Sequence, residues 1–431
     1  MASSPASSRP WRWVPSLYFL EGLPYVVVMT LATVMYKNFQ LSNTDIALYT
    51  SWLYLPWVVK PLWSPVVDLF GRKRRWTVTL QFVIGASLAL AALALPTPHY
   101  IALTLAVFWL MAFASATHDI AADGFYLIAA PAHEQAAFVG VRSTAYRLAM
   151  IAGQGGLVYL AGQWIEQTGS VSRAWVLVFS LLAVVFFLLA TYHAWALPVP
   201  ATDRPSVEGR AFLAEFGEVF AAFFRQEGIG RILAFLLLYR FAEAQLLKLV
   251  SPFLLDPTAS GGLGLSNKEV GIAYGTVGIS ALVIGGLLGG WIISRVGLKR
   301  ALWPLMISMH LPNLVFVALA HWLPSDLVVV STAVAVEQFG YGLGFTAYLV
   351  FMMLVAGGEQ GENPHKTAHY ALCTGFMALG MMIPGMWAGW LEDHLGYFRF
   401  FLYACAATIP SFIAAYFVRI PPDFGRKIPQ K

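Results

Sequence analysis

Residues 41–49 read LSNTDIALY and residues 265–274 read LSNKEVGIAY, so the chain carries nearly the same string twice. Three further pairs follow in the same order: SPVVDLFGRKRR (64–75) with GWIISRVGLKR (290–300), HEQ (133–135) with GEQ (358–360), and LAGQWIEQTG (160–169) with WAGWLEDHLG (387–396). Chance can supply one such match, but an ordered set at a nearly constant interval indicates two parallel repeats. In a membrane protein two parallel repeats enclose a cavity along their pseudo-twofold axis, an arrangement typical of secondary transporters.

The composition excludes a soluble enzyme. Of the 431 residues, 58% are hydrophobic and only 11% are charged, whereas soluble domains carry about 25% charged residues. A lipid environment explains the deficit, because a charge at the bilayer centre costs at least about 2.5–3.5 kcal/mol. The two cysteines, Cys373 and Cys405, lie in apolar runs and argue against a disulfide framework or a thiolate metal site. We expect no cofactor, no metal site and no catalytic residue.

Twelve apolar runs approach the length of about 20 residues that a transmembrane helix needs. They lie at 14–36, 46–67, 76–95, 100–130, 138–162, 174–196, 229–255, 269–293, 301–322, 326–356, 367–391 and 397–418. A polar segment separates the sixth run from the seventh. The sequence therefore predicts an all-α integral membrane protein with twelve transmembrane helices in two pseudo-symmetric six-helix halves, 1–197 and 229–431, joined by a cytoplasmic linker at 198–228.

The basic residues predict the orientation. With a cytoplasmic N-terminus, nineteen Lys and Arg residues fall on the cytoplasmic side and four on the opposite side, namely Lys37, Arg173, Lys268 and Arg399. Such an asymmetry places both termini and the linker in the cytoplasm. The basic residues are dispersed among loops, so topology explains them and they do not indicate a nucleic-acid partner.

The repeated basic loop resembles a motif of the major facilitator superfamily, G-x-x-x-D-R-x-G-R-R, which that superfamily carries between helices 2 and 3 and again between helices 8 and 9. Residues 64–73 and 290–299 occupy these two places. Ser64, Leu69 and Ser294 depart from the pattern. The resemblance implies the twelve-helix fold of that superfamily and does not indicate a substrate.

Five residues of the repeated loop are candidates for gating: Asp68, Gly71, Arg72, Arg295 and Gly297. The two glycines suit a tight turn. Asp68, at a helix end, can meet the N-terminus of another helix or a neighbouring arginine and latch the halves on the cytoplasmic side. The simpler interpretation is that the arginines only anchor the loop, but neither an acidic residue nor a repeat is needed for anchoring.

Three further strings narrow the resemblance: LEGLP at 20–24, WVVKPLWSP at 57–65 and ATHDIAADG at 116–124. They resemble the branch that contains the AmpG-like muropeptide permeases of bacteria and the acetyl-CoA transporters of eukaryotes, in which x-G-[LI]-P, K-x-[LI]-W-[SA]-P-x-x-D and A-T-x-D-I-A-x-D recur. The match is close in the N-terminal half and architectural in the C-terminal half. It implies a multi-pass permease of the bacterial inner membrane whose substrate is a glycopeptide or another amphiphilic anion.

Ionisable residues at membrane depth are candidates for a functional site, because they normally face a cavity or a partner. Here the candidates for proton coupling or for lining a cavity are Glu21, His118, Asp119, Asp123, Arg147, Arg240, Glu243, Lys248 and Glu337.

Asp119 and Asp123 lie four residues apart and therefore share one face of a helix. Two ionised carboxylates repel each other in a low dielectric, so one holds a proton or pairs with a cation. We expect Asp119 to pair with Arg147 of the next helix and Asp123, nearer the cytoplasmic end, to handle a proton. The alternative is a static Asp–Arg pair that only locks the two helices together.

The other acidic candidates are Glu21, Glu243 and Glu337. Glu21 precedes a glycine and a proline that loosen its helix, and it either meets substrate or a proton or pairs with a cation across the cavity. Glu243 can be satisfied by Arg240 at a spacing of i,i+3. Glu337 precedes the glycines at 340, 342 and 344, which favour close helix packing rather than a phosphate loop.

Two basic candidates complete the set. Lys248 is less readily satisfied within its own helix, so a substrate anion is a candidate partner. His118 either relays protons or makes one structural hydrogen bond.

The leading hypothesis is a proton-coupled carrier of a bulky, partly anionic metabolite, and the resemblance implies anhydro-muropeptides imported for cell-wall recycling. A second hypothesis changes the cargo to an acyl-CoA-like thioester, a siderophore or a drug-like compound. A polytopic membrane enzyme is disfavoured because no nucleophile set, metal-ligand cluster or P-loop lies near a membrane face. The basic repeat argues against a non-transporting sensor. The expected partners are the small molecule, protons and the bilayer, and we expect a monomer.

Overall fold

The computed structural model describes residues 9–130, 132–201, 203–204, 209–358, 363 and 365–426. Within these ranges the chain consists of helices joined by short turns, and it contains no strand. The all-α fold class predicted from the sequence is therefore confirmed. Some side chains within helices, that of the expected gating residue Asp68 among them, lie outside the described set.

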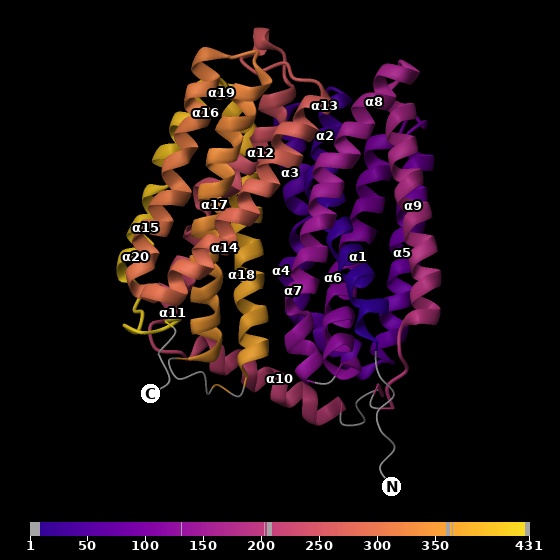
Figure 1. The fold of residues 1–431 in the computed structure, drawn as a ribbon, viewed down its shortest axis with the longest axis vertical. Helices are drawn as coiled ribbons and strands as arrows, with labels where there is room; N and C mark the ends of the chain where they lie inside the picture. Colours follow the sequence, from indigo (N-terminus) through magenta and orange to yellow (C-terminus); the bar gives the residue numbers. More distant parts are fainter. Residues whose placement is uncertain are drawn as a thin grey trace. The chain divides into compact units, whose positions relative to one another are not determined.

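The helices up to residue 196 correspond to the first six predicted spans (Figure 1). They are α1 (Val14–Val26), α2 (Ala32–Asn38), α3 (Asn43–Trp52), α4 (Leu55–Leu69), α5 (Lys73–Ala94), α6 (Tyr100–Ala129), α7 (Ala132–Met150), α8 (Val158–Thr168) and α9 (Val171–Ala196). One π-helical segment, Val27–Leu31, joins α1 to α2, and another, Ile151–Leu157, joins α7 to α8.

The remaining helices begin with α10 (Gly209–Phe224), which occupies the predicted linker. They continue with α11 (Ile229–Leu238), α12 (Phe241–Leu255), α13 (Asn267–Val270), α14 (Ile279–Val296), α15 (Leu298–His310), α16 (Leu314–Trp322), α17 (Leu327–Gly357), α18 (Lys366–Met386), α19 (Ala388–Ala406) and α20 (Ile409–Phe417). A third π-helical segment, Gly271–Gly278, joins α13 to α14.

Nine helical segments of the described residues are long and apolar enough to cross a membrane. The other three predicted spans coincide with α3 and α4, with α7 and α8, and with α11 and α12. Two of these spans are interrupted by turns, at Leu53–Tyr54 and at Tyr239–Arg240. The chain is thus a multi-pass membrane protein, and the count of twelve spans stays a prediction.

The repeated LSN string starts a helix in both copies. Ser42 accepts a hydrogen bond from the backbone of Asp45 and caps α3, and Ser266 caps α13 in the same way through Glu269. The acid three residues after the serine completes a capping box in the second copy. The string is repeated because the same start signal is needed at the same place in both repeats.

The described contacts divide the chain into two compact units. Unit 1 comprises Met1–Leu31, Leu62–Gly153 and Leu160–Leu213, and unit 2 comprises Ala32–Pro61, Gln154–Tyr159 and Ala214–Lys431. Unit 2 therefore includes α2, α3 and the start of α4, which belong to the predicted N-terminal half. The division into halves at the linker stays a prediction.

In unit 1, α5 packs against both α6 and α9, and α1 packs against α7 (Figure 1). An apolar cluster joins the start of α1 to the end of α6, where the ring of Trp13 meets Phe125 edge-on with centroids 5.4 Å apart. This cluster brings Tyr18 of α1 close to the last turns of α6.

In unit 2, α17 packs against both α14 and α15. Two glycines permit this: a Cβ at Gly340 would lie 2.0 Å from the carbonyl oxygen of Ser308 in α15, and one at Gly342 would lie 2.2 Å from that of Leu282 in α14. The glycine-rich run thus serves close helix packing, as the sequence predicts.

Candidate functional site

Asp123 is held by a cation and a phenol in unit 1. Its Oδ1 forms an ion pair with Nη2 of Arg142 and accepts a hydrogen bond from the Tyr18 hydroxyl at 3.1 Å. The Arg142 guanidinium also lies 4.0 Å from the centroid of the Tyr18 ring and 4.5 Å from that of Tyr126. The Asp123 side chain is 49% exposed. This carboxylate therefore has a charge partner and is only half-buried in the protein.

The expected pair of Asp119 with Arg147 is not formed. The Arg147 Nε donates to Ser143 Oγ at 3.4 Å, and no described carboxylate pairs with this arginine. The register of the helix hairpin explains the error. The helices α6 and α7 run antiparallel, and Asp123 of α6 pairs with Arg142 of α7. Asp119, one turn before Asp123, therefore lies level with Tyr146, one turn after Arg142. Asp119 and Glu21 accordingly act electrostatically on Tyr146, not on Arg147.

The LEGLP string forms the crossing of α1 with α7. A Cβ at Gly22 would lie 2.9 Å from the Ala149 Cβ, so only glycine allows this approach. Pro24 lies inside α1 and precedes the π-helical segment, which is consistent with a proline that removes a backbone donor and disturbs the helix. Glu21 is thereby placed where α1 meets α7.

His118 belongs to a buried polar chain that crosses four helices of unit 1. Ser16 Oγ lies 2.8 Å from His193 Nε2, His193 Nδ1 lies 2.9 Å from Gln81 Oε1, and Gln81 Nε2 lies 3.0 Å from His118 Nε2. The Gln81 amide determines which ring nitrogens carry a proton. Its carbonyl oxygen accepts from Nδ1–H of His193, and its NH₂ group donates to Nε2 of His118. We call these four residues the polar chain. It joins α1, α9, α5 and α6.

Two buried acids lie close together in unit 2. Glu243 of α12 and Glu337 of α17 are both 0% exposed, and Glu243 acts electrostatically on Glu337. Neither oxygen of Glu243 has a hydrogen-bond partner among the described residues, nor does Oε1 of Glu337. Oε2 of Glu337 accepts from Gln338 at 2.9 Å. We call Glu243 and Glu337 the acid pair.

Arg240 does not satisfy Glu243 in the expected way. It is the residue before α12, with φ −109° and ψ 19°, so the i,i+3 geometry of a continuous helix is lost. Its guanidinium donates to the Tyr341 hydroxyl and lies 4.8 Å from the centroid of the Phe345 ring. Arg240 nevertheless acts electrostatically on Glu243, so a positive charge accompanies the acid pair.

Lys248 is a buried cation, and no described carboxylate pairs with it. Its Nζ donates to Thr50 Oγ1 at 2.9 Å and lies 5.0 Å from the centroid of the Tyr54 ring. Its side chain is 5% exposed. A hydroxyl and an aromatic face leave the charge uncompensated, which suits a site that receives an anion.

A closed ring of polar contacts joins α2 and α3 to the C-terminal end of α12 and to α19. Lys37 Nζ lies 2.7 Å from both Asp256 Oδ1 and Asn43 Oδ1. Tyr397 donates to Asp256 Oδ2 at 2.6 Å and accepts from Asn43 Nδ2 at 2.8 Å, and the same Nδ2 lies 2.6 Å from Glu392 Oε2. We call these five residues the Lys37 network. A cavity of about 420 Å³ adjoins it.

The Lys37 network was not predicted from the sequence. One signal was available: Asn43 and Asn267 occupy the same position of the repeated LSN string. Asn267 exchanges hydrogen bonds of 2.6 and 3.0 Å with Asn38 of α2. Each copy of the string therefore carries an asparagine that contacts the other repeat.

Each repeated basic loop is hydrogen-bonded to a later segment of the chain, the first loop to the segment after α9 and the second to the segment after α20. Asp203 accepts hydrogen bonds from the backbone of Lys73 and Arg74 at 2.8 and 3.0 Å. In the second copy, the Phe424 carbonyl accepts from the backbone of Leu298 at 2.8 Å. The helix after each loop thus receives acceptors at its positive N-terminal end.

The four remaining gating candidates lie at these turns. Gly71 and Gly297 have φ of 123° and 81°, values that favour glycine. Arg72 caps α5 without a side-chain hydrogen bond. Arg295 lies 5.5 Å from the centroid of the Trp291 ring. The Asp68 side chain lies outside the described residues, so its latch stays a prediction.

Residues 16–363 match the model of the Major Facilitator Superfamily. The chain belongs to this superfamily. It is therefore a membrane transporter and not an enzyme, and the family resemblance seen in the sequence is confirmed.

Two relatives and one solved structure illustrate the similarity. An anhydromuropeptide permease of Escherichia coli (strain K12) is 28% identical over 423 residues, which cover 95% of this chain and 80% of the relative. A protein named putative transporter AmpG 4 of Rickettsia conorii is 26% identical, over 93% of this chain and 94% of its own. The crystal structure of a D-xylose–proton symporter has a TM-score of 0.67 at 15% identity, covering 96% of this chain and 98% of its own. This likeness shows the fold.

Proposed function

We propose that this transporter imports anhydro-muropeptides through the bacterial inner membrane, driven by protons. The observation that carries the proposal is the similarity to the anhydromuropeptide permease over 95% of this chain. The three strings that resemble the AmpG-like branch lie in α1, α4 and α6, and two of them contain the candidates Glu21, His118, Asp119 and Asp123.

The cations of unit 2 support an anionic glycopeptide as cargo. Lys248 and Arg240 are buried, and each lies beside aromatic rings. A buried cation can form an ion pair with a carboxylate of the peptide, and an aromatic ring can stack on the apolar face of a sugar ring. The proposal assigns Lys248 to the substrate carboxylate, because Arg240 already contacts Tyr341 and influences the acid pair.

The acid pair supports coupling to protons. Two carboxylates buried together repel each other strongly when both are ionised, and burial with a donor to only one of their four oxygens disfavours the charge further. A proton on one of them removes both costs. We assign the proton to Glu337 and Glu243 as a shared site. Asp123 is less suited to this role, because Arg142 compensates its charge.

The Lys37 network is proposed as the outer gate, and the repeated basic loops as the inner gate. The network lies near α13 and the turns at 39–42 and 256–266, on the side that the basic asymmetry predicts to be periplasmic. A thiol replacing exposed Ser260 should react with an impermeant maleimide in intact cells, whereas one replacing exposed Arg225 should react only after lysis. Labelling of position 225 in intact cells would contradict the orientation, with both termini cytoplasmic.

Uptake of labelled anhydro-muropeptide into proteoliposomes tests the function. We expect accumulation when the outside is acidic and a membrane potential is imposed, and loss of accumulation with a protonophore. Unlabelled muropeptide should compete, and acetyl-CoA should not. Competition by acetyl-CoA alone would contradict the cargo, and accumulation that survives the protonophore would contradict the coupling.

A further inference from the structure

A second cavity lies in unit 2, apart from the acid pair, Lys248 and the Lys37 network. It has a volume of about 570 Å³, within the usual size range of small-molecule sites. The end of α10, the start of α11, the end of α17 and the segment after α20 form its walls. Nothing in the transport cycle proposed above uses it.

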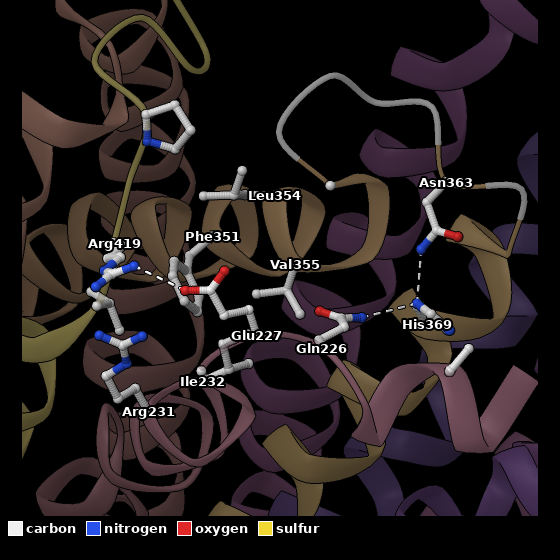
Figure 2. A pocket seen from close by; sticks show the side chains of 15 residues that line it. Gln226, Glu227, Arg231, Ile232, Phe351, Leu354, Val355, Asn363, His369 and Arg419 are labelled. Atoms are coloured by element: carbon white, nitrogen blue, oxygen red, sulfur yellow. Dashed lines mark hydrogen bonds and ion pairs between the residues drawn. The ribbon is translucent and has the colours of Figure 1, made fainter.

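The cavity has a cationic end and an apolar floor. Figure 2 shows Arg231 and Arg419 at one end, with Glu227 beside them, and Ile232, Phe351 and Val355 between this end and His369. Glu227 pairs with Arg419 at 3.1 Å, but both side chains are more than 70% exposed, so the pair is weak and open to exchange. No described carboxylate pairs with Arg231. Two guanidinium groups and one carboxylate leave a charge of +1.

The opposite end of the cavity is neutral and fixed. Nδ1 of His369 accepts hydrogen bonds from the amide NH₂ groups of Gln226 and Asn363 at 3.1 and 2.8 Å (Figure 2). Its Nε2 lies 3.1 Å from the Val219 carbonyl oxygen. Two donors at Nδ1 and an acceptor at Nε2 define the neutral Nε2–H tautomer. His369 therefore ties the end of α10 to α18 and adds no charge to the cavity.

The position of Arg231 is built into the turn before α11. Gly228 has φ +74°, and a Cβ there would lie 2.6 Å from Nη2 of Arg231. The guanidinium thus folds over the glycine and stays at the cavity instead of extending away from it. Its side chain is half-buried.

The cavity opens beside a surface suited to acyl chains. Ile409, Ile413, Tyr416 and Phe417 of α20 are 57%, 55%, 74% and 55% exposed. They recur at helical spacing along a segment that is apolar enough to cross a membrane. Arg419 follows two residues after this face ends, and an arginine just beyond a transmembrane helix can reach lipid headgroups.

We propose that this cavity binds the headgroup of an anionic phospholipid, with the phosphodiester between Arg231 and Arg419. A phosphodiester carries one negative charge, which matches the net charge of the cationic end. Arginine suits phosphate because its planar group donates two parallel hydrogen bonds. The neighbouring apolar face receives the acyl chains, which favours a lipid over a free anion.

Native mass spectrometry of the purified full-length protein tests the site directly. The probes are dioleoyl-phosphatidylglycerol, dioleoyl-phosphatidylcholine and inorganic phosphate. We expect one phosphatidylglycerol to bind at least about tenfold more tightly than phosphatidylcholine, and inorganic phosphate at equal concentration not to displace it. The double variant Arg231→Gln/Arg419→Gln should lose this preference.

Two further variants separate the site from diffuse charge and from misfolding. Arg225→Gln removes a neighbouring charge that pairs with Glu218 outside the cavity, and it should change affinity less than about twofold. Ala222→Phe fills the cavity and keeps both arginines, and it should also lose the preference. Equal phosphatidylglycerol affinity in the wild type and in folded cavity variants would overturn the proposal. Displacement by inorganic phosphate would overturn the assignment to a lipid.

Discussion

Asp123 in unit 1 and the acid pair in unit 2 differ in the partners that surround their carboxylates. In unit 1, Asp123 is half exposed and meets a guanidinium and a phenol. In unit 2, the acid pair is fully buried, and three of its four oxygens have no hydrogen-bond partner among the described residues. A half-buried carboxylate beside a guanidinium is stable when ionised, whereas two buried carboxylates that share one nearby cation favour a proton on one of them. We therefore predict that Asp123 orders helices and that the acid pair handles the proton.

The largest expected effect comes from neutralising the acid pair. Glu337→Gln keeps the size of the side chain and removes the exchangeable proton, so accumulation driven by a proton gradient should fall at least about tenfold. Exchange of labelled for unlabelled substrate should persist, because exchange needs no net proton movement. Glu218→Gln, at an exposed position, is the control. Equal loss of exchange in a folded Glu337→Gln protein would show that this residue serves binding or structure instead.

The next effect concerns the cation of the same unit. Lys248→Met keeps most of the length of the side chain and removes the charge, so the apparent KM for anhydro-muropeptide should rise about tenfold, which corresponds to about 1.4 kcal/mol. The response of uptake to the proton gradient should remain. An unchanged KM in the presence of normal transport would exclude Lys248 from the substrate site.

A smaller effect, on stability, is expected from the polar chain of unit 1. Gln81→Leu leaves His118 and His193 without their shared partner, and each unsatisfied buried group costs about 1–3 kcal/mol. The melting temperature in detergent should fall, whereas the coupling of the remaining folded protein should be retained. The control is Gln154→Leu, because Gln154 lies in the π-helical segment Ile151–Leu157 and is not part of the polar chain. A melting temperature equal to that of the wild type would show that the polar chain contributes little.

The smallest effect is expected at Asp123. Its ion pair with Arg142 is partly exposed, and such pairs contribute about 1 kcal/mol or less. Asp123→Asn should therefore lower the melting temperature slightly. The double variant Asp123→Asn/Arg142→Gln should be less destabilised than the sum of the single variants, as expected for two residues in contact. Additive effects would show that the pair is not energetically coupled.

The sequence predicted the fold because its signals are local or periodic. Hydropathy marks the spans, and the repeated LSN string marks two helix starts through Ser42 and Ser266. The turn glycines at 71 and 297 follow from the repeated loop. Each of these features depends on residues that are close together in the sequence.

The sites were harder to predict because their partners come from different helices. Arg142 fell among the cytoplasmic basic residues, yet the hairpin register pairs it with Asp123. Arg240 was one candidate partner of Glu243 within a continuous helix, but a turn precedes α12. The Lys37 network joins residues more than 200 positions apart, and only the repeated asparagine indicated it.

Proton flux measured with substrate flux tests the central claim most directly. In proteoliposomes holding a pH-sensitive dye, adding anhydro-muropeptide outside should acidify the lumen through the wild type and through Asp123→Asn. The Glu337→Gln variant should take up substrate down its gradient without acidification. Acidification by Glu337→Gln at the wild-type ratio of protons to substrate would contradict the account, as would its loss in a folded Asp123→Asn protein that still transports.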